Sequence, residues 1–174
     1  MSFELLLHLR DSLQELFQGS TYRDPAESDP EEEEAWIKPR FFIGALPPKR
    51  KGGQTNEDFP FILVRAIGGE DSEGQTDIDV EIICGFYTDD SEEDGTNIIM
   101  QVVNRIRQHL LQRRLFGKKY DLQLPINWTT GTDEERNQPH PYYVGQIRAT
   151  FRTFQAPQMF DVEGELETYG SGYE

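Results

Sequence analysis

The sequence feature that most constrains the fold is a strict two-residue alternation over residues 76–87. Apolar side chains occupy every second position of this segment: Ile78, Val80, Ile82, Cys84 and Phe86. A period of two sends successive side chains to opposite faces of a β-strand. We therefore predict a strand with one buried face. Its opposite face begins with three carboxylates, Asp77, Asp79 and Glu81.

Two other segments have the spacing of amphipathic helices. In residues 3–17 and 95–114 the apolar side chains recur at intervals of three and four, which places them along one side of a helix. The second helix follows a run of carboxylates and ends near arginines, as the helix dipole favours. Its polar side is uncharged and carries Gln101, Asn104, Gln108 and Gln112.

Four more segments are apolar or alternating, and we predict a strand in each: 36–46, 59–67, 119–126 and 142–154. The predicted order is helix, three strands, helix, two strands. Strands grouped in this way between helices indicate an α+β fold. We expect a mostly antiparallel sheet of about five strands, with both helices packed on one face. Trp128 falls in a polar segment, 127–141, which it is expected to anchor in the core.

Acidic residues gather in segments that we expect to lie outside this core. Residues 20–35 hold seven carboxylates and almost nothing apolar, which predicts a mobile acidic loop. Residues 155–174 are acidic and poor in aliphatic side chains, so we expect a flexible tail. The prediction is a single domain over residues 1–154. Within it, Lys49, Arg50 and Lys51 form a basic cluster in turn-rich sequence, either a solvated loop or a contact for a partner.

The net charge of −15 excludes several classes of function. Proteins that bind nucleic acids broadly, or anionic membranes, need an excess of basic residues. No apolar run approaches the ~18 residues of a membrane-spanning helix, and the N-terminal residues lack the pattern of a signal peptide. We therefore expect a cytoplasmic compartment and no membrane partner. A single cysteine, Cys84, excludes an intrachain disulfide and a cysteine-based zinc cluster.

Groups that carry chemistry do not gather at recognisable spacing. The three histidines, His8, His109 and His140, fall in different predicted elements and form no metal-spaced pair. The glycines match neither a phosphate-binding loop nor a nucleophile elbow. We therefore expect a binding or assembly protein rather than an enzyme, with no cofactor and no metal.

The acidic strand face leaves one enzymatic alternative open. Asp77, Asp79 and Glu81 share a face, and carboxylate oxygens are the ligands of Mg²⁺ and Ca²⁺. A metal-dependent nuclease would use such a site together with a lysine, but none lies between Lys51 and Lys118. The other interpretation is a solvated strand face that discourages edge pairing.

Charges of opposite sign are separated along the chain. Residues 70–94 hold eleven carboxylates, whereas residues 95–119 hold six basic residues and no acid. Two interpretations stay open: solvated loops beside one basic helix, or faces of opposite sign that meet between copies. The second makes Arg105, Arg113 and Arg114 candidate subunit-interface residues. Gln101, Asn104, Gln108 and Gln112 join them, because an uncharged polar side suits an interface; a plain solvent face is the alternative.

Four stretches carry a resemblance to a known family. They are FPFILVRAIGGEDSEGQTDIDVEIICGFYTDD, the helix GTNIIMQVVNRIRQHLLQRR, and LQLPINWTTG followed by HPYYVGQIRATFRTF. In this order they resemble the tail terminator proteins of tailed bacteriophages, also called minor tail or tail-to-head joining proteins. The likeness covers about residues 58–154 and the leading helix. The likeness does not extend to residues 20–35 and 155–174.

The resemblance implies a small α/β subunit that forms a ring, usually a hexamer, at the head-proximal end of the tail tube. Such a ring stops tube polymerisation and offers a surface to head or neck proteins, without catalysis. The protein would assemble in the host cytoplasm and belong to the virion tail. DNA would pass through the ring without specific binding. Asp77, Asp79 and Glu81 would then line the channel, where carboxylates repel DNA.

Two further alternatives remain beside the nuclease. A neck or head-closure protein, or another tail-assembly factor, also forms rings or assembles on them, and only its partner distinguishes it. An acidic adaptor domain unrelated to phages is the last.

Overall fold

The computed structural model describes residues 2–27, 29–48, 57–131 and 140–155. These residues form two α-helices, α1 (Ser2–Leu16) and α2 (Glu92–Arg113). The main sheet consists of β3 (Arg40–Ile43), β4 (Phe61–Ser72), β5 (Gln75–Tyr87), β6 (Leu115–Phe116), β7 (Tyr120–Thr130) and β8 (Tyr142–Phe154). A small second sheet pairs β1 (Tyr22–Arg23) with β2 (Trp36–Ile37).

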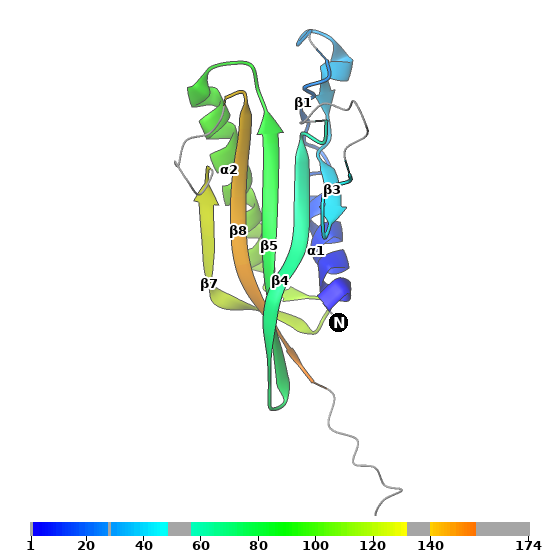
Figure 1. Cartoon of the computed structure of the whole chain (residues 1–174), viewed down its shortest axis with the longest axis vertical. Coiled ribbons are helices and arrows are strands. Elements are labelled where there is room, and N and C mark those ends of the chain that lie inside the picture. Colours follow the sequence, from blue (N-terminus) through cyan, green and yellow to red (C-terminus); the bar gives the residue numbers. More distant parts are fainter. Residues whose placement is uncertain (1, 28, 49–56, 132–139, 156–174) are drawn as a thin grey trace, which may run out of the picture.

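The main sheet has the strand order β3-β4-β5-β8-β7-β6. Strand β3 pairs with β4 in parallel, and the other neighbouring strands of this sheet pair antiparallel. Both helices lie behind the sheet in Figure 1, on the same face. The predicted α+β class and the mostly antiparallel sheet are therefore confirmed.

The core lies between the sheet and the two helices. The five alternating residues of β5, from Ile78 to Phe86, are at most 4% exposed, as the period of two predicts. They pack against leucines of α1 and the apolar side of α2. Helix α2 approaches β8 closely at Gly95, where an added Cβ would lie 2.0 Å from the ring of Tyr143. The packing at that point therefore requires a residue with no side chain.

The β4–β5 hairpin is longer than the sequence predicts. Residues 68–75 were expected to form a loop, but β4 continues to Ser72 and β5 begins at Gln75. The glycines and acids of this stretch favour a loop locally, whereas pairing with β5 keeps it extended. Gly69 lies so close to β5 that an added Cβ would be 2.5 Å from the Asp77 carbonyl oxygen. The hairpin therefore projects beyond both helices (Figure 1).

The acidic segment 20–35 is also more ordered than its composition predicts. The pairing of β1 with β2 encloses it, and the Asp24 amide donates to the Ala35 carbonyl at 2.8 Å. Two carboxylates accept hydrogen bonds from backbone amides two residues ahead, at Ala26 and Glu31. Such local turns satisfy the backbone, and the buried Arg23 and Ala35 fix the segment to the domain.

Two predicted features lie outside the described residues. They are the basic cluster of Lys49, Arg50 and Lys51, and all of the predicted tail except Gln155. Within the described part, neither helix combines the length and apolar character needed to cross a membrane.

Candidate interaction surface

We use the name open face for the side of strands β4, β5, β8 and β7 that points away from the helices. At one end it carries a compact apolar cluster, in which Phe59, Phe61 and Leu63 are at most 9% exposed. Aromatic rings meet edge to face there, with 5.1 Å between the ring centres of Phe59 and Tyr142. This second cluster contains no residue of α1 or α2, so it stabilises the open face independently of these two helices.

Next along the open face is a straight row of polar residues, which we call the arginine row. Cross-strand pairing aligns Arg65, Glu81, Arg148 and Asn127 on β4, β5, β8 and β7. Glu81 lies beneath both arginines with its side chain only 2% exposed. It accepts from Arg65 Nε at 2.7 Å and from Arg148 Nε at 3.1 Å, and also from the amide of Gln146. One buried carboxylate thus serves two guanidinium groups, and the row keeps one net positive charge.

The other end of the open face is acidic. Asp79 accepts a hydrogen bond from the Thr150 hydroxyl at 2.6 Å. Asp77 forms a bidentate ion pair with Arg152, in which both hydrogen bonds are 2.7 Å long. Hydrogen bonds from Arg152 hold the pKa of Asp77 below its usual value. Beyond them lies the acidic hairpin tip, which we define as residues 70–73.

The carboxylates of β5 are paired, whereas the sequence alone indicates an acidic strand face without partners. Asp77, Asp79 and Glu81 share a face, as predicted, but each has a partner on a neighbouring strand. Alternation within one strand reveals the carboxylates, whereas their partners on β8 come from a segment about 70 positions away, and Arg65 comes from β4. The channel-lining role of the three carboxylates stays a prediction, now for a face of mixed charge.

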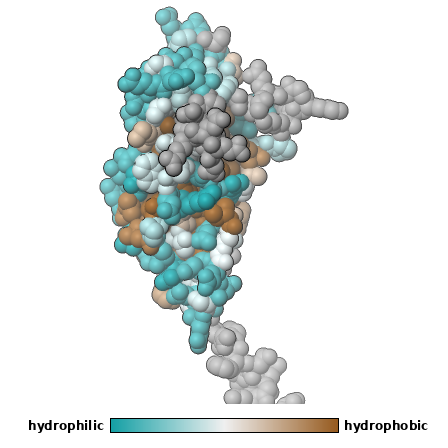
Figure 2. Space-filling view, turned by 60° about the vertical axis from the view of Figure 1, so that its left-hand side comes forward, coloured by the Kyte–Doolittle hydropathy of each residue, from teal (hydrophilic) through white to brown (hydrophobic). Residues whose placement is uncertain are grey.

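Helix α2 exposes the uncharged side that the sequence predicts. Gln101, Asn104, Gln108 and Gln112 are all exposed. Figure 2, which brings the left-hand side of Figure 1 forward, shows a mostly hydrophilic surface with patches of apolar residues near the middle. The assignment of this side as a subunit interface stays a prediction.

The three candidate arginines all have partners within the chain. Arg105 donates to the Leu16 carbonyl and to Ser20 Oγ, each at 2.9 Å, and covers the ring of Phe17 at 4.4 Å. Arg113 donates to Ser12 at 3.2 Å, and Arg114 donates to the Leu122 carbonyl at 3.1 Å. Arg105 therefore ties α2 to the end of α1, a role that the sequence does not reveal.

Trp128 does not anchor a loop in the core. It belongs to β7, is 42% exposed, and lies beneath the guanidinium of Arg107, 4.6 Å from it. Strand β7 continues to Thr130, into the first residues of the segment predicted to be a loop, so Trp128 lies beside α2. A shallow hollow of about 270 Å³ lies between this tryptophan and the helix.

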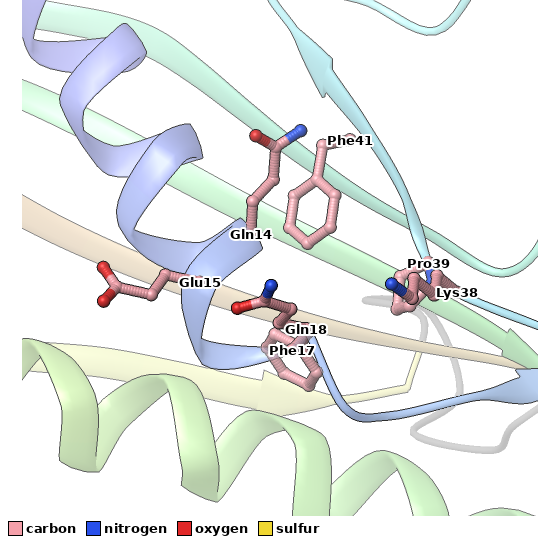
Figure 3. A pocket seen from close by; sticks show the side chains of 7 residues that line it. All are labelled: Gln14, Glu15, Phe17, Gln18, Lys38, Pro39 and Phe41. Carbon is pink, nitrogen blue, oxygen red and sulfur yellow. The ribbon is translucent and has the colours of Figure 1, made fainter.

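A larger hollow, of about 380 Å³, lies between the end of α1 and the start of β3. Figure 3 shows Gln14 and Phe41 side by side, with Glu15 and Lys38 at opposite ends. The lining holds one acid, one base and no histidine or cysteine. These groups do not converge on a common point, so the hollow offers no arrangement for acid–base chemistry.

The groups best suited to chemistry are used in packing. Cys84 is buried, and burial raises the pKa of its thiol to about 12, so it is not a ready nucleophile. Ser12 is 4% exposed and shares a 2.5 Å hydrogen bond with Nε2 of His109 between the two helices. Among the described residues, no group of three His, Cys, Asp or Glu side chains is placed to hold a metal ion.

The His109 contact makes stability depend on pH. Partial burial and the nearby charge of Arg113 lower the pKa of His109, against a smaller opposing effect of Glu15. As the pH falls, His109 therefore takes up a proton in the unfolded chain before it does so in the folded protein. The contribution of His109 to stability is complete above the unfolded pKa, about 6.5, and is lost as the pH falls below that value. We expect denaturant unfolding to show a smaller loss between pH 8 and about pH 5.5 for His109→Gln than for the wild type. His8 and His140 are common to both proteins, so equal losses would contradict the assignment.

Comparison with known proteins assigns no family. No protein-family model matches the chain, and no curated protein matches it.

Proposed function

We propose that this chain is a structural protein of a tailed-bacteriophage virion that assembles into a ring of six copies. The ring would cap the head-proximal end of the tail tube, end tube polymerisation and join the tail to the head. The subunit acts through self-association and through binding to the terminal ring of the tube.

The observation that carries this proposal is the open face, in a chain whose segments resemble the family in the same order. The two described helices lie on one side of the main sheet (Figure 1), and the other side presents apolar, cationic and acidic zones in sequence along it. A closed ring needs two different surfaces on each subunit, because every copy contacts its neighbour head to tail. A face with separate zones supplies surfaces of that kind.

The outer side of α2 supports the same proposal. Four exposed amide side chains follow one another there: Gln101, Asn104, Gln108 and Gln112. Amides pair with polar groups of a partner at a lower desolvation cost than Lys or Glu, which interfaces avoid at their centres. Met100 and Leu111, 48% and 40% exposed, flank this side with apolar surface.

The proposal is tested by the mass and shape of the assembled protein. We expect light scattering behind a sizing column to give a peak near six times 20.1 kDa, with ring-shaped particles in negative stain. A subunit that assembles only on its template would instead stay monomeric and form rings on purified tail tubes, which would stop growing when it is added. Tubes that keep growing and carry no terminal density would overturn the proposal.

A further inference from the structure

We propose that the acidic hairpin tip of one copy docks on the arginine row of the next copy. The contact would join Glu70 and Glu73 to the guanidinium groups of Arg65 and Arg148. The proposed ring would bring these two surfaces together, so the inference rests on the proposed function.

The arginine row is built to receive a second carboxylate. Glu81 is buried beneath the two guanidinium groups and neutralises one of their two charges, while Arg65 and Arg148 keep side chains 42% and 56% exposed. Both arginines direct Nε to Glu81. Nη1 of Arg65 and both terminal nitrogens of Arg148 make no hydrogen bond with another described residue, so planar donor groups remain for an incoming carboxylate.

The surface beside Arg148 is hollowed. Arg148 borders a depression of about 250 Å³ together with Asp79 and Thr150, and another of about 100 Å³ together with Asn127 and Gln146. Buried Glu81 fixes one end of each guanidinium, which reduces the side-chain entropy that a new ion pair would cost. The row therefore offers a preorganised cationic site in a chain whose net charge is −15.

The hairpin tip supplies the complementary charge. Residues 67–77 contain four acids and no base, and every residue from Ala66 to Gly74 is exposed. Glu70 and Glu73 form no ion pair with another described residue. Continuous pairing of β4 with β5 up to Ser72 and Gln75 keeps the tip extended, so the acids are held away from the helices (Figure 1).

A copy cannot satisfy its own arginine row with its own tip. Arg65 and Glu70 lie on the same strand, β4, and five residues of strand span roughly 16 Å at about 3.3 Å per residue. Because the hairpin is paired along its length, it cannot fold back over that distance without breaking the ladder. The contact must therefore be made between copies, each of which supplies one tip and one row.

The first experiment removes two charges from the tip. We expect Glu70→Gln with Glu73→Gln to weaken self-association about three- to tenfold in sedimentation velocity at about 20 mM salt, as for two exposed ion pairs. The matched control, Glu31→Gln with Glu32→Gln, makes the same change of net charge at other exposed positions. A less negative net charge reduces the general repulsion between copies. The control is therefore expected to associate as well as the wild type or slightly better.

The second experiment tests the contact directly. Ser72→Cys and Asn127→Cys place one thiol on the tip and one beside Arg148, while Cys84 is buried and unreactive. Under mild oxidation we expect a 1:1 mixture of these two variants to give disulfide-linked dimers several-fold faster than either variant alone. The link should slow at about 300 mM salt, where charges are screened over a shorter distance.

Three results would overturn the inference. They are self-association of the tip variant equal to that of its control, a mixture that cross-links no faster than single variants, and a wild type that stays monomeric at high concentration and low salt. None of them decides the proposed function, because capping of tail tubes is measured separately and would still be found if other surfaces join the ring.

Discussion

Gly95→Ala is expected to destabilise the protein by about 2–3 kcal/mol, the cost of overpacking a core. An alanine in a helix is normally about 1 kcal/mol better than glycine. Here the new Cβ would lie 2.0–2.6 Å from three atoms of the Tyr143 ring. That ring is 1% exposed and its hydroxyl bonds His140 at 2.8 Å, so it has no room to move. Helix α2 would have to shift away from β8.

The measurement is thermal unfolding, and the expected decrease in Tm is about 5–10 °C for a chain of this size. Gly19→Ala is the matched control, because an added Cβ there meets nothing within 4 Å. We expect the control to change Tm by less than about 2 °C. An unchanged Tm for Gly95→Ala would mean that α2 does not pack on Tyr143 as described.

Arg105→Met is expected to destabilise the protein by about 2–4 kcal/mol. Methionine keeps apolar contact with Phe17 but removes the donors to the Leu16 carbonyl and to Ser20 Oγ. The Leu16 carbonyl lies at the end of α1, where helical carbonyls lack partners within the helix. Loss of bonds from a charged donor costs about 1.5–3 kcal/mol each, partly offset by water reaching the freed groups.

Arg107→Met is the control for Arg105→Met. Arg107 lies on the same helix, and among the described residues it has no hydrogen bond or ion pair, only the contact with the ring of Trp128. Such a cation–π contact at a partly exposed site is worth about 0.5–1 kcal/mol. Urea unfolding should therefore rank wild type, Arg107→Met and Arg105→Met in falling order of stability. Equal stabilities of the two variants would contradict the structural role assigned to Arg105.

The elements that sequence predicts well are those whose signal is local. Strand β5 was predicted because its buried and exposed residues alternate without interruption, and α2 because its apolar side recurs every three or four residues. Both patterns follow from one element lying against one core. The α+β class then follows from the order of such elements along the chain.

The features that sequence missed depend on distant partners. The glycines and acids of residues 68–75 indicate a loop until β5 is known to pair with them. Arg105 looks like one of several helix arginines until the end of α1 is known to lie beside it. The buried position of Glu81 likewise depends on Arg65 and Arg148, which come from two other strands. The charged site was therefore visible as residue types but not as a geometry.

The unequal lengths of β3 and β4 have a consequence for how copies of this chain can join. Strand β3 pairs with β4 only from Phe61 to Val64, although β4 continues for eight more residues. Among the described residues no strand pairs with this border of β4 beyond Val64. Such an edge allows strand addition, which is how sheets of different molecules merge and aggregate. Glycines and carboxylates at that border oppose such merging. Copies joined through side chains rather than through a shared sheet would stay separable, so an incorrectly placed subunit could leave and be replaced during assembly.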